Sequence, residues 1–104
     1  MVLFTIGLEI QHKNHPEFLQ TFSSVSKEVR LLKGCICYHI YQNFEQKKKL
    51  CLHSVWIDKD SLKAFTSSKN FKITMGAIKT LSALPKMEYG VIESIDPENL
   101  LNDL

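Results

Sequence analysis

Residues 2–10 alternate between apolar side chains and smaller or polar ones, a period of two that is typical of a half-buried strand. The apolar members of this alternation are Val2, Phe4, Ile6, Leu8 and Ile10. A single strand leaves one apolar face and half of its backbone hydrogen-bonding groups without partners. The rest of the chain must therefore supply further strands and a layer that covers the apolar face.

An amphipathic helix is predicted directly after this strand. Asn14 followed by Glu17 has the spacing of a capping box, and Pro16 suits the first turn of a helix. Gly34 is typical of the end of a helix, because glycine readily adopts the left-handed conformation found there. Between these signals apolar residues recur at spacings of four and three, namely Phe18, Phe22, Val25, Val29 and Leu32.

A hairpin and two short helices are predicted next. Residues 35–43 and 49–57 are rich in β-forming side chains, and residues 44–48 between them have a length suited to a hairpin loop. Asp58 and Ser68 are good N-caps for two short helices that follow.

The last part of the chain completes the fold prediction. Pro85 is expected to end the helical region, and residues 87–95 alternate again, which predicts a fourth strand. The order βαββαβ is that of an α+β, ferredoxin-like domain with a four-stranded antiparallel sheet covered on one face by helices. We expect residues 1–96 to form this single domain and residues 97–104 to form a C-terminal tail.

Composition excludes several function classes. The 104 residues carry thirteen Lys and Arg against eleven Asp and Glu, a near balance that does not call for nucleic acid. The sequence has no apolar run long enough to span a membrane and no signal peptide, so we expect a cytoplasmic protein. Three cysteines, an odd number, favour reduced thiols over a disulfide framework. Because one sheet face would lack cover, a homodimer that packs two sheets face to face is expected.

Several short motifs follow one another in a fixed order along the chain: Gly34-Cys35, Tyr38, Tyr41, Val55-Trp56-Ile57-Asp58, Leu62 and Ser68-Lys69-Asn70-Phe71. Their order and spacing resemble the antibiotic biosynthesis monooxygenase family, whose members are dimeric α+β barrels. Its members include oxygenases that use no metal or flavin on quinol or aromatic polyketide substrates, haem-degrading enzymes and an isomerase of a signalling sugar phosphate. The resemblance implies a homodimer that acts without a cofactor on O2 and a small aromatic or quinol-like molecule.

The chain departs from the family at several positions. Phe65 and Asn70 stand where many members have histidines. Residues that serve haem degradation in other members correspond here to Ile6, Phe65 and Met75, so that activity is not expected. Trp56 matches the polyketide oxygenases, but their polar partners are replaced by Tyr41, Leu52, Leu62 and Met75.

Two faces of the predicted sheet carry candidate site residues. Alternation places Ile36, Tyr38 and Ile40, with Leu50, Leu52, Ser54 and Trp56, on the face toward the helices. An apolar cavity there could bind an aromatic ring, with the Tyr38 hydroxyl and the Trp56 N–H as polar groups. The expected lining is Phe4, Ile6, Trp56, Phe65, Phe71 and Met75. The alternative is that these side chains are simply hydrophobic core.

The opposite face collects titratable groups: Cys35, Cys37, His39, Tyr41, Cys51 and His53. His39 and His53 are the central groups whose ordinary pKa, near ~6.5, suits proton transfer, so His53, His39 and Tyr38 are the catalytic candidates. His12 and His15 are expected to be surface or cap residues. Imidazole and thiolate also suit Zn or Cu, but no metal-binding spacing is present and we expect no metal.

Three functions remain open from the sequence. The first is a cofactor-independent monooxygenase in which Trp56 and Tyr38 position the ring. The second is a non-enzymatic module that binds a small metabolite, and the third is a cofactor-free isomerase that requires a titrating base such as His39 or His53.

Overall fold

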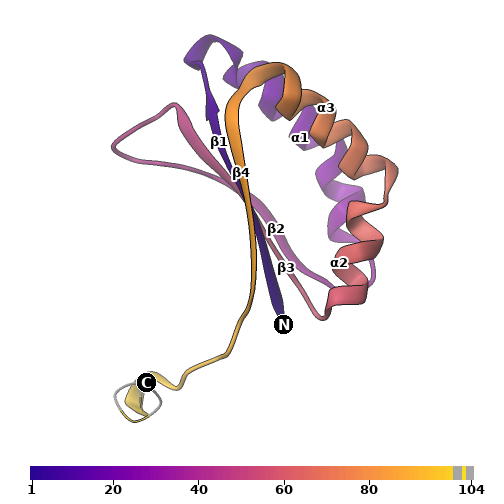
Figure 1. Cartoon of the computed structure of the whole chain (residues 1–104), viewed down its shortest axis with the longest axis vertical. Helices are drawn as coiled ribbons and strands as arrows, with labels where there is room; N and C mark the ends of the chain where they lie inside the picture. The colour runs from indigo at the N-terminus through magenta and orange to yellow at the C-terminus, as the bar shows by residue number, and fades with distance from the viewer. Residues whose placement is uncertain (100–101, 103–104) are drawn as a thin grey trace.

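The computed structural model describes residues 1–99 and residue 102, and its four strands form one antiparallel sheet in the order β2-β3-β1-β4 (Figure 1). The strands are β1 (Val2–Ile10), β2 (Cys35–Gln42), β3 (Lys49–Trp56) and β4 (Ser82–Val91). The helices are α1 (His15–Arg30), α2 (Lys59–Thr66) and α3 (Lys69–Leu81), with 3-10 turns at His12–Asn14 and Pro97–Asn99. This arrangement confirms the predicted α+β, ferredoxin-like fold. Residues 100, 101, 103 and 104 of the predicted tail lie outside the described residues.

The three helices all lie on one face of the sheet (Figure 1). The apolar side of β1 points toward them, so that Val2, Phe4, Ile6, Leu8 and Ile10 are buried, as the alternation predicts. In the part of the chain that the structure describes, no helix covers the other face of the sheet. No helix of the described residues is long and apolar enough to cross a membrane.

The β2–β3 hairpin has the predicted register over most of its length. His39 lies opposite His53, and Tyr41 lies opposite Cys51. The register shifts by one residue between Cys35 and Cys37. A bulge of this kind reverses which face a side chain takes. As a result Cys35 packs against the core and Ile36 is exposed, so the predicted faces of these two residues were wrong.

Strand β4 begins earlier than predicted and includes Pro85. Residues 7 to 9 of β1 pair with residues 86 to 83 of β4, so β4 carries one extra residue at this point. The missing N–H of proline is tolerated because β4 is an edge strand and the bulge already interrupts the ladder. The predicted strand at 87–95 was therefore shifted, and α3 ends at Leu81 without the proline.

The start of α1 also differs from the prediction. Asn14 adopts helical dihedral angles at the end of the 3-10 turn, and its side chain caps no backbone N–H. The predicted capping box with Glu17 is therefore absent. His15 is buried rather than a surface residue, and its Nε2 lies 2.8 Å from the carbonyl oxygen of Ile10. This contact ties the end of β1 to the first turn of α1.

The remaining helix signals are confirmed. The Asp58 carboxylate accepts a hydrogen bond from the Ser61 N–H at 2.8 Å, and the Ser68 hydroxyl accepts one from the Phe71 N–H at 3.2 Å. Gly34 has a φ of 86°, the left-handed conformation expected where the chain leaves α1.

Candidate functional site

An aromatic cluster fills the space between the sheet and the helices. Tyr38 from β2, Trp56 from β3 and Phe65 from α2 are fully buried. The Trp56 and Phe65 rings are stacked with centroids 4.8 Å apart, and Tyr38 meets Phe65 edge to face at 5.6 Å. Aromatic pairs prefer these offset and perpendicular arrangements. The cluster therefore brings together residues that are distant in the sequence.

The cluster extends toward both ends of the helical layer. Phe71 of α3 lies 5.3 Å from Phe65 and 6.2 Å from Phe4 of β1. Ile6 is buried among the same core residues, and Met75 packs against them while remaining partly exposed. All six predicted binding residues therefore belong to one contiguous cluster, whether it serves as core or as a site.

Sequence reasoning missed two members of this cluster. Phe22 of α1 stacks on Tyr38 at 5.2 Å, and the helical spacing that marks it as a core residue does not reveal this contact. Ser54 is fully buried beside Trp56. The available signal for Ser54 was a small polar residue at an inward-facing position of a buried strand, where a hydroxyl needs a partner.

The polar group of Trp56 is used inside the protein. Its indole N–H donates to the Ser54 hydroxyl at 3.0 Å, and that hydroxyl donates to the carbonyl oxygen of Phe4, also at 3.0 Å. This short chain fixes the orientation of the indole ring. Trp56 is therefore held in a fixed orientation against Phe65 and has no spare donor.

The Tyr38 hydroxyl is buried, and it has no hydrogen-bond partner among the described residues. Burial raises the pKa of this phenol, and the nearby Thr74 hydroxyl partly offsets that effect. Thr74 donates its own proton to the carbonyl oxygen of Asn70 at 2.9 Å, and no hydrogen bond of good geometry joins the two hydroxyls. The phenol of Tyr38 is therefore protonated at neutral pH.

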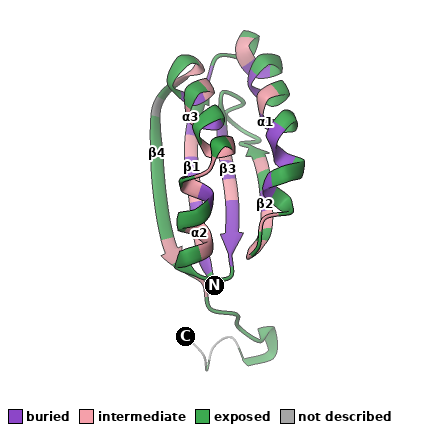
Figure 2. Cartoon of the chain, turned by 90° about the vertical axis from the view of Figure 1, so that its right-hand side faces the viewer, coloured by how far each residue is buried: buried purple, intermediate pink, exposed green. Residues whose placement is uncertain are grey.

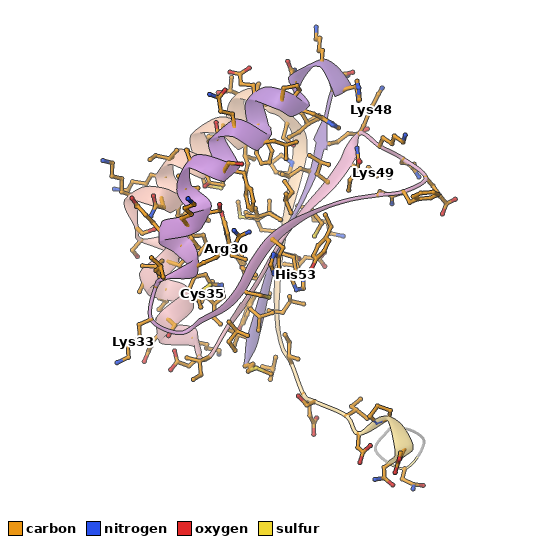
Figure 3. The ribbon with its side chains drawn as sticks, turned by 180° about the vertical axis from the view of Figure 1, so that it is seen from behind. Arg30, Lys33, Cys35, Lys48, Lys49 and His53 are labelled. Carbon is orange, nitrogen blue, oxygen red and sulfur yellow. The ribbon has the colours of Figure 1, made fainter. Side chains whose placement is uncertain are left out.

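Arg30 holds the Tyr38 segment from the side of α1. Its Nε donates to the Tyr38 carbonyl oxygen at 3.0 Å, and its guanidinium lies over the Phe22 ring at 5.9 Å. Figure 3 shows Arg30 between α1 and the sheet. The contact with the backbone fixes the strand without engaging the hydroxyl.

The margin of the cluster faces β4. Phe71 and Met75 are only partly buried, and the neighbouring strand presents Tyr89 opposite Phe4 and Met87 opposite Ile6. Tyr89 is 60% exposed, and Figure 2 shows that β4 lies outside the area covered by the helices. The cluster therefore has a partly exposed apolar border.

His39 and His53 lie on the opposite face of the sheet from Tyr38, as the alternation predicts. The Tyr41 ring lies 6.1 Å from the His39 ring and meets the His53 ring edge to face at 5.6 Å. Figure 3 shows His53 on the side of the sheet away from α1. The sheet itself therefore separates these imidazoles from the aromatic cluster.

A hollow of about 500 Å³ lies beside these groups on the open face. Its lining includes Gly7, Tyr41, Cys51, Lys49 and Lys86, and none of the predicted binding residues. Burial, and then the charge of Glu88, raise the pKa of the Cys51 thiol, which keeps it protonated. Within residues 1–99, no group of three or more His, Cys, Asp or Glu is arranged to hold a metal ion.

Comparisons with known proteins agree with this fold. The profile of the family described as antibiotic biosynthesis monooxygenase matches residues 1–77. No curated protein matched the chain. A solved structure of SnoaB, described as a cofactor-independent oxygenase from Streptomyces nogalater, has a TM-score of 0.79 at 16% identity, and the match covers 92% of this chain and 96% of that one.

Two further solved structures show the same architecture. One, from Deinococcus radiodurans and described as a candidate antibiotic biosynthesis monooxygenase, has a TM-score of 0.83 at 16% identity over 92% of this chain and 97% of that one. A conserved protein from Methanosarcina mazei has a TM-score of 0.81 at 21% identity, and the match covers 86% of this chain and 89% of that one. At these identities the structural likeness shows the fold alone. Because the family profile covers well over half of the sequence, the chain belongs to the antibiotic biosynthesis monooxygenase family.

Proposed function

We propose that this protein is a monooxygenase that uses O2 to oxidise a quinol-like or phenolic ring without a metal or an organic cofactor. Membership of the family supports the reaction class, and the description of SnoaB as a cofactor-independent oxygenase supports the absence of a cofactor. We place the site at Tyr38 because its buried hydroxyl, inside an aromatic cluster, has no hydrogen-bond partner in the described part of the chain. Such a group is costly unless a ligand accepts its hydrogen bond.

The cluster suits the first step of such a reaction. A flat ring enters past Phe71 and Met75, which lie at the partly exposed margin, and displaces packed side chains to reach the buried rings of Trp56 or Phe65. The Tyr38 hydroxyl donates to the oxygen of the substrate and stabilises its phenolate, because a hydrogen bond to the charged form favours that form. The electron-rich anion then passes an electron to O2 in a site from which water is excluded.

In this scheme the substrate loses its proton to solvent before the ring is enclosed in the cluster. Tyr38 cannot act as the base, because its raised pKa keeps it protonated. His39 and His53 cannot act on a ring in the cluster, because the sheet lies between them and Tyr38. A catalytic role for either imidazole, as in the isomerase alternative, would require a substrate on the open face.

A homodimer through the open face is part of the proposal. Thr5, Cys37, Cys51 and His53 on this face are only partly buried, and Val55 contributes an apolar centre. A second copy would cover these groups by the same face, since homodimers most often use a two-fold axis. The aromatic cluster lies on the other side of each sheet, so each copy would hold its own site.

Oxygen uptake tests the proposed function directly. The purified protein is assayed with a panel of quinols and anthrones, and the Tyr38→Phe variant is compared with Tyr41→Phe. Loss of the hydroxyl from the cluster should lower turnover at least about a hundredfold, the usual effect of removing one donor to a developing anion. The control removes a hydroxyl from the open face and should leave turnover unchanged.

The folding of the Tyr38→Phe variant provides an internal check. Removing an unpartnered buried hydroxyl should leave the free energy of unfolding unchanged or raise it slightly. Urea unfolding measures this change. Equal turnover in both variants, or a loss of turnover that merely follows a loss of stability, would contradict a role for Tyr38.

A non-enzymatic binding module is the second candidate. The observation that favours it is the neutral Tyr38 phenol, which can bind a ring oxygen but cannot remove its proton. In that case the same compounds should bind, with affinity that depends on Tyr38, while no oxygen is consumed.

A further inference from the structure

The open face carries a row of side chains that the proposed oxygenase site does not use. His39 lies directly opposite His53, Thr5 lies beside His53 on the next strand, and Glu88 follows on β4. The only imidazole that takes part in a side-chain hydrogen bond within the described residues is that of His15. The ring nitrogens of His39 and His53 are therefore available.

The distance between directly opposed residues suits chelation by two imidazoles. Side chains opposite each other in an antiparallel pair have Cβ atoms about 4.5–5.5 Å apart. A zinc ion bound by two histidines at about 2.0–2.1 Å holds the two nitrogens roughly 3.4 Å apart in tetrahedral geometry. Each histidine has two rotatable side-chain bonds, and this freedom is what would allow two opposed imidazoles on fixed strands to reach such a separation.

Tyr41 packs beside the two histidine rings. It lies on the same face, two residues after His39, and contacts both imidazoles at centroid distances of 6.1 and 5.6 Å. Both imidazoles therefore turn relative to the Tyr41 ring when they bind one ion together.

We propose that His39 and His53 together bind one divalent transition-metal ion, Zn²⁺ first among them, on the open face of the sheet. Neutral imidazole suits Zn²⁺, Cu²⁺ and Ni²⁺, whereas Mg²⁺ and Ca²⁺ prefer oxygen. Water fills the remaining positions in a single chain, since no third ligand converges there among the described residues. When two copies pack through this face, the partner's pair can replace that water.

Sulfur does not contribute to this site. Cys51 lies opposite Tyr41, two register positions away from the directly opposed pair of His39 and His53 on the same face. The site is also independent of the proposed oxygenase chemistry, because Tyr38 and the aromatic cluster lie across the sheet.

Titration calorimetry with Zn²⁺ on the whole, reduced protein tests the proposal. His39→Gln and His53→Gln should each weaken binding by at least about tenfold, the lower end of the loss seen even for groups that only support a ligand. His12→Gln is the matched control: His12 is exposed and its ring lies 5.3 Å from that of His15, so it resembles the pair but lies outside it. This variant should bind as the wild type does, with one ion per chain or one per two chains.

Two further measurements distinguish metal binding by His39 and His53 from metal binding by other side chains. Co²⁺ in place of Zn²⁺ should give a ligand-field spectrum without a sulfur-to-metal charge-transfer band, and Cys51→Ser should bind normally. Circular dichroism shows whether each variant is folded, which is expected because both histidines are at least partly exposed. Unchanged binding in His39→Gln or His53→Gln, binding lost in Cys51→Ser, or no binding by the wild type would each overturn the proposal.

Discussion

Single side chains decide what the aromatic cluster can do. The Trp56 N–H is satisfied through Ser54, while the Tyr38 hydroxyl is left without a partner. Strand and helix periodicity predicted the membership of this cluster, because it depends on which residues point inward. It could not predict which hydroxyl finds a partner, because that depends on the rotation of side chains from separate elements.

Ser54→Ala tests the hydrogen-bond chain that orients Trp56. The substitution leaves the indole N–H without a partner in the core, and a buried donor in this state costs about 1–3 kcal/mol. Urea unfolding should show a loss of that size. Ser24→Ala, on the exposed side of α1, should change the free energy of unfolding by less than about 0.5 kcal/mol. Equal effects in the two variants would show that the chain of bonds does not stabilise the core.

Secondary-structure elements were predicted well where a local signal determines them. The caps at Asp58 and Ser68 depend only on neighbouring residues, and both are present. The predictions failed where pairing overrides local preference, as in β4, which continues through Pro85 because a bulge absorbs the extra residue. The predicted cap at Asn14 was wrong for a related reason, because Asn14 belongs to the tight 3-10 turn that joins β1 to α1 and has helical dihedral angles.

Replacement by alanine should have opposite effects on stability at two of the glycines. Gly34 has a positive φ, and a Cβ there would also collide with the Ser61 side chain, so Gly34→Ala should destabilise the protein by more than about 1 kcal/mol. Gly76 lies inside α3 with open space around it, and Gly76→Ala should stabilise the protein by roughly 0.5–1 kcal/mol. Thermal or urea unfolding of both variants checks the pair, and changes of the same sign would refute this assignment.

The cap of α2 predicts an acid-dependent contribution to stability. The hydrogen bond from the Ser61 N–H, followed by that from the Ser61 side chain, lowers the pKa of Asp58 in the folded state. A lowered pKa means that the contribution is present above the unfolded value, near ~3.9, and is lost as the pH falls through the folded value.

Unfolding measured from neutral to acidic pH should reveal this contribution. The wild type should lose more stability below about pH 4 than Asp58→Asn does, because asparagine can cap the helix without titrating. Asp60→Asn, two residues away on the exposed first turn of α2, serves as the control. A difference between wild type and Asp58→Asn that is independent of pH would argue against the cap.

The whole molecule has two unlike faces. The helices cover one, except over β4 (Figures 1 and 2). The other carries a mixed layer of polar groups, thiols and apolar side chains. A small domain with half of its sheet uncovered gains stability by association.

Thr5→Lys tests association through the open face. Thr5 lies in the central strand, beside His53 on one side and Glu88 on the other, so a lysine there places a charge in the middle of the proposed interface. Sedimentation velocity should show a dimer for the wild type and a monomer for the variant. Gln20→Lys, on the exposed surface of α1, should remain a dimer. A wild type that sediments as a monomer at every concentration would rule out this interface.

The stacking of Trp56 on Phe65 has a practical consequence, because Trp56 is the single tryptophan of the chain. Its indole is fully buried and hydrogen-bonded at the centre of the proposed site. The fluorescence of the protein excited at the red edge of its absorption therefore reports on this one place. A ring that enters the cluster must quench or shift that emission. A zinc ion bound on the open face should leave it nearly unchanged, so one fluorescence titration distinguishes binding at the two sites.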